Sequence, residues 1–280
     1  ARALPVLKPE FALVANDLDN AELRHMAAGC RLALAERLLS GLHLQEAEPP
    51  LREATAALEQ LTQAQPKMPA IWQSLAEAYT NEAEFQRSSS RLEDAERAAQ
   101  KAVEVHRRLL SEYPGTPGYQ QELARCLLDF AQLHAAEGWQ FQKAEQPLHE
   151  AVDLARQVVE RQPDDPIARS LSVRARRQLA AWLVTQVRIA EGEEMARAAA
   201  EEAERLIAKH PDVPAYEGQL ADILVVLCHL QRALLKWQDA EKTILRGQTL
   251  CEQLSTRYPT QLEYQVALAI CQSALGQIHY

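Results

Sequence analysis

Residues 66–79 read PKMPAIWQSLAEAY, and this stretch returns three times further along the chain. The later copies are PGTPGYQQELARCL at 114–127, PDDPIARSLSVRAR at 163–176 and PDVPAYEGQLADIL at 211–224. The four stretches begin with a proline, and a fifth proline follows at the same interval, so that the spacings are 48, 49, 48 and 48 residues. We call these five the ladder prolines: Pro66, Pro114, Pro163, Pro211 and Pro259. Self-similarity at such a period indicates stacked supersecondary units, each of which packs mainly on its neighbours.

Other positions keep the same register. A small residue stands twelve residues before each ladder proline, at Ala54, Ala102, Ala151, Ala199 and Gly247. A leucine followed by a small residue comes after each proline, at Leu75, Leu123, Leu171, Leu220 and Leu268. In the fourth unit, Leu171 and Ser172 come one residue early relative to the prolines, so we expect a local adjustment near residues 161–170.

The sequence predicts two antiparallel helices in each unit. Only 9 of the 280 residues are glycine, and Ala, Leu, Glu, Gln and Arg are abundant, which favours helix. The first helix should begin after the proline pair, with Asp165 as one N-cap. The second should begin near a large apolar residue, and Ser90 with Glu93 predicts a capping box at one such start. We expect pairs at about 19–64, 68–112, 116–161, 165–209 and 213–257, then a lone helix at about 261–280.

The second unit resembles the tetratricopeptide repeat (TPR). It carries Trp72, Leu75, Ala76 and Tyr79 on its first helix, then Ala95, Ala99, Ala102 and Pro114. The family's repeat has 34 residues, whereas these units have two further turns in each helix. Lengthened units of this kind resemble the arrays appended to bacterial signalling proteins, Ser/Thr kinases included. The resemblance implies an all-α fold, a right-handed α-solenoid of antiparallel helix pairs with about 11 helices, or five and a half repeats.

One repeat array is expected after a short extension. The N-terminal extension covers residues 1–18 and the TPR-like solenoid residues 19–280. The units are expected at about 19–66, 67–114, 115–163, 164–211 and 212–259, with a half unit at 260–280. Since the chain begins at Ala1 and not at methionine, we expect a processed chain or a fragment of a longer protein.

Several classes of function are disfavoured. A net charge of −9 argues against nucleic acid or an anionic membrane as the partner, and no apolar run approaches the length of a membrane span. There is no Gly-rich phosphate loop, no dinucleotide fingerprint and no H-E-x-x-H pair, so we expect no enzyme, no cofactor and no metal site. Five cysteines without a C-x-x-C pair indicate reduced thiols and a cytoplasmic location.

Three cysteines share one repeat position. Cys30, Cys126 and Cys271 stand where other units have Ala78 and Ile223, which indicates a packing role. The same alignment places Arg174 at this position in the fourth unit. An unpaired buried cation would be costly there, so Arg174 should either turn outward, pair with an acidic residue, or bind a partner.

By the same resemblance, side chains of the first helices line a concave groove and vary from unit to unit. The expected partner-binding residues are Gln73, Glu77, Asn81, Gln121, Arg125, Asp129, Arg169, Arg174, Arg176, Arg177 and Asp222. Arg169, Arg176 and Arg177 should lie on one face of one helix, with Arg125 from the neighbouring unit. Such a cluster suits an anionic element of a partner; the alternative is a solvated face with intramolecular pairs to Asp129 and glutamates.

These observations lead to a non-catalytic protein–protein interaction scaffold that binds a partner peptide or helix in its groove. Two alternatives are a structural assembly subunit and a regulatory or sensory segment of a signalling protein such as a Ser/Thr kinase. In the assembly alternative, the last helix would expose Val266, Ile270 and Leu275 and allow self-association.

Overall fold

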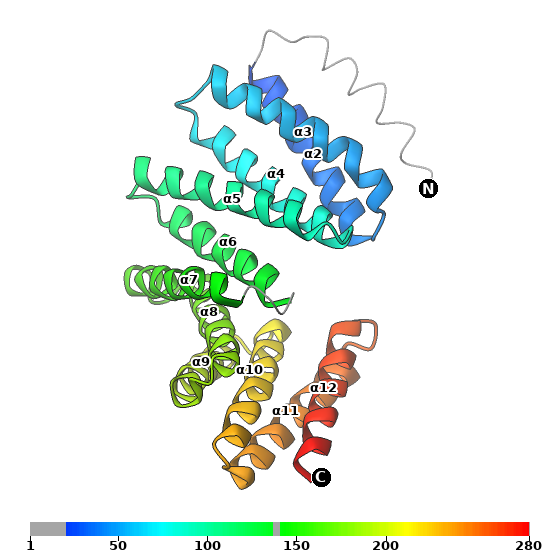
Figure 1. Ribbon diagram of the computed structural model, residues 1–280, viewed down its shortest axis with the longest axis vertical. Coiled ribbons are helices and arrows are strands. Elements are labelled where there is room, and N and C mark those ends of the chain that lie inside the picture. The colour runs from blue at the N-terminus through cyan, green and yellow to red at the C-terminus, as the bar shows by residue number, and fades with distance from the viewer. Residues whose placement is uncertain (1–20, 137–140, 280) are drawn as a thin grey trace. The chain divides into compact units, whose positions relative to one another are not determined.

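The chain folds into helices throughout the part that the structure, a computed structural model, describes: residues 21–136 and 141–279 (Figure 1). This part contains eleven helices and no strand. They are α2 (Ala21–Ser40), α3 (Leu44–Ala64), α4 (Pro69–Ser88), α5 (Leu92–Glu112), α6 (Pro117–Ala136), α7 (Phe141–Arg161), α8 (Pro166–Thr185), α9 (Ile189–Lys209), α10 (Pro214–Ala233), α11 (Trp237–Arg257) and α12 (Leu262–His279). The predicted all-α fold of antiparallel helix pairs is confirmed; the predicted extension 1–18 lies outside the described residues.

The helix boundaries follow the proline pairs. The second proline of each pair is the first residue of α4, α6, α8 and α10. Proline is well tolerated there because its missing N–H would have no intrahelical partner. Asp165 caps α8 as predicted, since its carboxylate accepts a hydrogen bond from the Ile167 N–H at 2.9 Å. The helices that follow, α3, α5, α7, α9 and α11, begin at the large apolar residue of each unit.

The turns inside the described pairs share one strained conformation. Leu42, Ser90, Val187 and Leu235 all adopt a left-handed backbone, with φ between 58° and 60°. In each turn two backbone hydrogen bonds close the preceding helix, as in Ser90 N–H to Arg87 O (3.0 Å) and Arg91 N–H to Gln86 O (2.8 Å). This is a Schellman motif, whose left-handed position glycine normally occupies. The predicted capping box is wrong, because Ser90 occupies this position and Arg91 is the N-cap of α5.

Two compact units make up the described chain, one ending at Leu133 and the other beginning at His134, inside α6. Within each, neighbouring first helices lie side by side: the His25 ring and the Ser74 hydroxyl are 2.8 Å apart across α2 and α4. The Gln219 amide likewise donates to the Ser170 hydroxyl at 2.8 Å across α8 and α10. Buried alanines allow this close packing, because a methyl group lets two helix backbones approach.

The expected adjustment near residues 161–170 does not occur. The backbone bond from Asp165 N–H to Gln162 O repeats Met68 to Gln65 and Val213 to His210, and α8 begins at its proline like α4, α6 and α10. The prolines therefore define the register of the fourth unit. Ser172 and Val173, both buried, take the places of Leu75 and Ala76, and Leu171 is half-buried beside them.

The corrected register also moves Arg174. Buried Ala175, and not Arg174, occupies the position shared with Cys126 and Cys271. Arg174 instead corresponds to Glu77, Arg125 and Asp222, eleven residues after their ladder prolines, where side chains face solvent or are half-buried. The alignment that placed Arg174 at this packing position was therefore wrong, and the alternative that Arg174 turns away from that position fits the structure. The predicted packing role is confirmed for Cys126 and Cys271, which are buried, and is wrong for Cys30, which is exposed.

Candidate partner-binding surface

In the first unit, the predicted groove residues of α4 and α6 form a polar surface. Gln73, Glu77 and Arg125 are exposed, and the others, Asn81, Gln121 and Asp129, are half-buried. The Nδ2 atom of Asn81 is shielded from solvent and has no hydrogen-bond partner within the described chain. Buried alanines and leucines occupy the packing positions next to these side chains on the same helices, as the repeat alignment predicted.

Carboxylates surround the one arginine of this surface. The Arg125 guanidinium is hydrogen-bonded to Glu122 on the same helix, and Asp129 also lies within its electrostatic reach. Partial desolvation raises the pKa of Glu77; Glu36 raises it further and Arg125 opposes the rise. Three carboxylates, those of Glu77, Glu122 and Asp129, therefore interact with one guanidinium, and this group of four side chains has a negative net charge.

A cavity of about 140 Å³ opens beside this surface, between α4, α5 and α6. Its apolar walls are Ala83, Ala99, Ala102, Cys126, Phe130 and Leu133, and its polar rim is Thr80, Glu84, Arg87, Asp129 and Gln132. Ala99 leaves the space open: Leu51 and Leu148 occupy the same repeat position and are buried. The cavity has room for one apolar side chain of moderate size.

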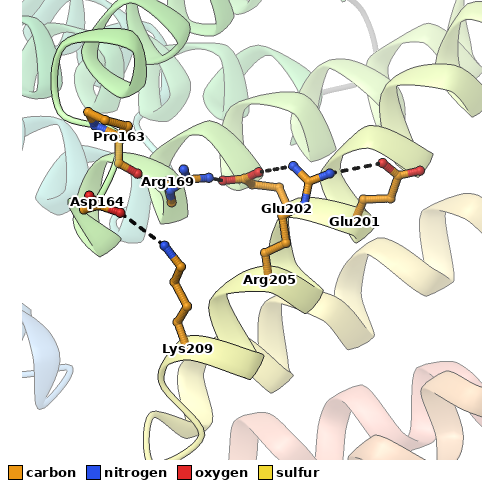
Figure 2. A network of polar contacts seen from close by, with 7 residues as sticks. All are labelled: Pro163, Asp164, Arg169, Glu201, Glu202, Arg205 and Lys209. Atoms are coloured by element: carbon orange, nitrogen blue, oxygen red, sulfur yellow. Dashed lines mark hydrogen bonds and ion pairs between the residues drawn. The ribbon is translucent and has the colours of Figure 1, made fainter.

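In the second unit, the Arg169 side chain is half-buried and is held by contacts within the protein. Its Nε donates to the carbonyl of Pro163 at 2.5 Å, and its Nη1 is paired with Glu202 of α9 (Figure 2). The two side chains are only 20% and 10% exposed. Glu202 also lies 3.4 Å from Arg205, which in turn approaches Glu201, so the guanidinium of Arg169 belongs to an internal network.

This role of Arg169 recurs along the array. Six residues after a ladder proline, Trp72 Nε1 donates to the Pro66 carbonyl and Gln265 Nε2 to the Pro259 carbonyl, both at 3.0 Å. A proline carbonyl at the end of a helix needs a donor from outside that helix. This anchor was not predicted from the sequence, although the register carries an N–H-bearing side chain at this position in four of the five units: Trp72, Gln120, Arg169 and Gln265.

Two of the predicted groove residues, Arg177 on α8 and Asp222 on α10, interact electrostatically. Asp222 is exposed, yet desolvation by the surrounding helices raises its pKa. Arg177 opposes that rise and Glu263 of α12 adds to it. Arg176 is half-buried beside Arg177. The convergence of Arg125 with the arginines of α8 would span the two compact units and stays a prediction.

Within residues 21–136 and 141–279, no group of three or more His, Cys, Asp or Glu side chains could hold a metal ion. None of the helices described has an apolar stretch long enough to cross a bilayer.

Solved structures share the fold at low sequence identity, whereas no protein-family model and no curated sequence matches the chain. BtubC (BKLC) from P. vanneervenii is similar with a TM-score of 0.60 and 15% identity, over 89% of this chain and 92% of that one. A Signal Transduction ATPase with Numerous Domains (STAND) protein with a tetratricopeptide repeat sensor, from Pyrococcus horikoshii, has a TM-score of 0.62 and 16% identity. That match covers 91% of this chain and 36% of the ATPase. The fold of this chain is therefore TPR-like.

Proposed function

We propose that the chain is a non-catalytic protein–protein interaction scaffold that holds a partner peptide or helix against the first helices. The cavity between α4, α5 and α6 carries this proposal. An apolar pocket with a polar rim, next to exposed polar side chains, suits one anchoring side chain of a partner and its polar flanks. TPR-like arrays offer such extended surfaces because each unit repeats the same scaffold with different outward residues.

The charge of the surface favours particular residues on either side of the partner's apolar anchor. Near the cavity, the three carboxylates around Arg125 favour a basic residue beside the apolar anchor. An anionic element is proposed only for α8, where Arg174, Arg176 and Arg177 lie within one turn of helix. Arg169 does not contribute to that site, since Glu202 and Pro163 occupy its guanidinium.

Two alternatives keep specific support. An assembly subunit is favoured by the apolar residues that α12 exposes: Leu262, Val266 and Ile270 are 72%, 57% and 47% exposed. Leu275, which the sequence placed on the same face, is half-buried against the core. A sensory segment is favoured by the similar STAND protein, whose TPR array is called a sensor.

Selection from a random peptide library tests the proposal. Peptides selected by the native protein should share one apolar residue flanked by lysine or arginine. Ala99→Leu places an isopropyl group in the cavity, at a position that already accepts leucine in two units. It should weaken the selected peptides about 10- to 100-fold, because burial of one apolar side chain contributes about 1.5–3 kcal/mol.

Gln100→Leu is the matched control, since Gln100 is the exposed neighbour of Ala99 on α5. It should leave the affinity unchanged. Equal binding to the native protein and Ala99→Leu would remove the cavity from the site. A failure to select any peptide, together with a concentration-dependent oligomer in light scattering, would favour the assembly subunit.

A further inference from the structure

Two buried thiols meet between the last two described helices. The sulfur atoms of Cys251, on α11, and Cys271, on α12, are 4.0 Å apart, and neither side chain is exposed. A third thiol, Cys228 of α10, belongs to the same apolar cluster. All five cysteines of the chain are free.

The surroundings leave the two sulfurs room to approach. A disulfide needs an S–S distance of about 2.05 Å, so the gap must close by about 2 Å, which rotation of the two side chains can supply. Gly247 lies one turn before Cys251 on α11, and a Cβ atom built there would stand 3.5 Å from the Cys271 sulfur. Glycine at this position therefore places no side chain against the Cys271 sulfur.

We propose that Cys251 and Cys271 are a redox-active thiol pair that a peroxide oxidises to a disulfide joining α11 to α12. This inference is independent of the partner-binding proposal, because neither residue lines the candidate surface.

The oxidation runs in two balanced steps. The Cys251 thiol first releases its proton, and the thiolate attacks one oxygen of hydrogen peroxide. The O–O bond breaks, a sulfenic acid forms on Cys251, and the leaving hydroxide takes up the released proton to become water. The Cys271 sulfur then attacks the sulfenic sulfur, the S–S bond forms, and a second water carries away the hydroxyl group and the thiol proton. Two electrons pass from the two thiols to the peroxide.

Cys251 is the better first nucleophile of the pair. The two sulfurs lie within hydrogen-bond reach of each other, and this contact lowers the pKa of Cys251. The same contact and desolvation raise the pKa of Cys271. Desolvation also raises the pKa of Cys228, so the third thiol is a poorer attacker.

The earlier units do not repeat this pair of cysteines. Cys251 and Cys271 are twenty residues apart in the sequence. The residues at the same two positions in earlier units are Leu58 and Ala78, His106 and Cys126, Ala155 and Ala175, and Ala203 and Ile223. None of these is a second thiol pair. Alanine occupies both positions in one unit, which makes cysteine-to-alanine substitutions compatible with the packing.

Peptide mapping of the native full chain tests the proposal. The folded protein is treated with hydrogen peroxide, alkylated and digested with trypsin without reduction. Cleavage after Arg246 and Arg257 separates residues 247–257, which hold Cys251, from residues 258–280, which hold Cys271. We expect these two peptides to stay joined with a mass loss of about 2 Da, to separate on reduction, and to be lost in Cys251→Ala.

Cys228→Ala is the matched control and should keep the crosslink. The oxidised protein should also melt about 5 °C higher than the reduced one, because the bond closes a loop between α11 and α12. Alkylation of both Cys251 and Cys271 after a peroxide dose that oxidises exposed Cys30 would overturn the proposal. A crosslink to Cys228, or one that forms only in denaturant, would overturn it equally.

Discussion

Replacement of Arg169 by alanine should destabilise the second unit by about 3 kcal/mol. The hydrogen bond to the Pro163 carbonyl contributes about 1 kcal/mol. The pair with Glu202 contributes about 2 kcal/mol more, because both side chains are largely buried and the lone carboxylate would keep only Arg205. The melting temperature should fall by about 6–10 °C, measured by circular dichroism with urea unfolding as a second assay.

Two variants divide this loss into its parts. Arg169→Gln keeps a donor for the proline carbonyl, as Gln265 does in the last helix, and should lose only about 2 kcal/mol. A double-mutant cycle of Arg169→Ala and Glu202→Ala should give a coupling energy of about 1.5–2 kcal/mol.

Arg156→Ala serves as the control, because its pair with Glu160 on α7 is about half exposed at both ends. Such pairs contribute less than about 0.5 kcal/mol. An Arg169→Ala loss no larger than that of Arg156→Ala would refute the reasoning and return Arg169 to the solvated groove. If the large loss is found, Arg169 is unsuitable for testing an anionic partner by charge reversal, and Arg174, Arg176 and Arg177 are the residues to reverse.

Two further predictions concern stability. Val187→Gly should stabilise the protein by about 1 kcal/mol in urea unfolding, because valine is strained at φ 60° and its side chain is exposed. Val213→Gly is the control and should give no stabilisation, because φ is −105° there. Burial lowers the pKa of His106 from 6.5 to about 4. Above pH 6.5 the neutral ring therefore contributes up to about 3 kcal/mol to the free energy of unfolding, and this contribution is lost as the pH falls toward 4. His106→Leu, with the residue found at Leu58, should flatten the stability profile over that range; an unchanged slope would contradict the assignment.

The helix pairs could be predicted from the sequence because backbone rules determine them. The ladder prolines end one helix and the second proline begins the next, so the predicted bounds agree with the structure to within about two residues. At Leu171 and Ser172, the residue types match the repeat one position earlier than the proline spacing does. The loop hydrogen bonds show that the helix follows the proline spacing. A buried serine in place of leucine costs less than a shifted helix, which would move every packing position at once.

The site was predicted less well, for physical reasons. Whether an arginine faces a partner or a carboxylate depends on the neighbouring helix, as Arg169 and Glu202, thirty-three residues apart, illustrate. The cavity beside Ala99 depends equally on three helices: a repeat position with alanine leaves space only where the facing side chains do not fill it. The partner-binding residues remain a prediction, with Asp129 beside the cavity as the one most directly connected to it.

The side-chain anchor on the proline carbonyl has a consequence for how such arrays can change length. Trp72, Arg169 and Gln265 each bond the carbonyl of the proline six residues earlier in the chain. A gene duplication or deletion of one whole unit, with its breakpoint before such a proline, carries donor and acceptor together and so separates none of these three pairs. Arrays of this kind can therefore lengthen or shorten by one unit at a time, and each new junction inherits a complete turn.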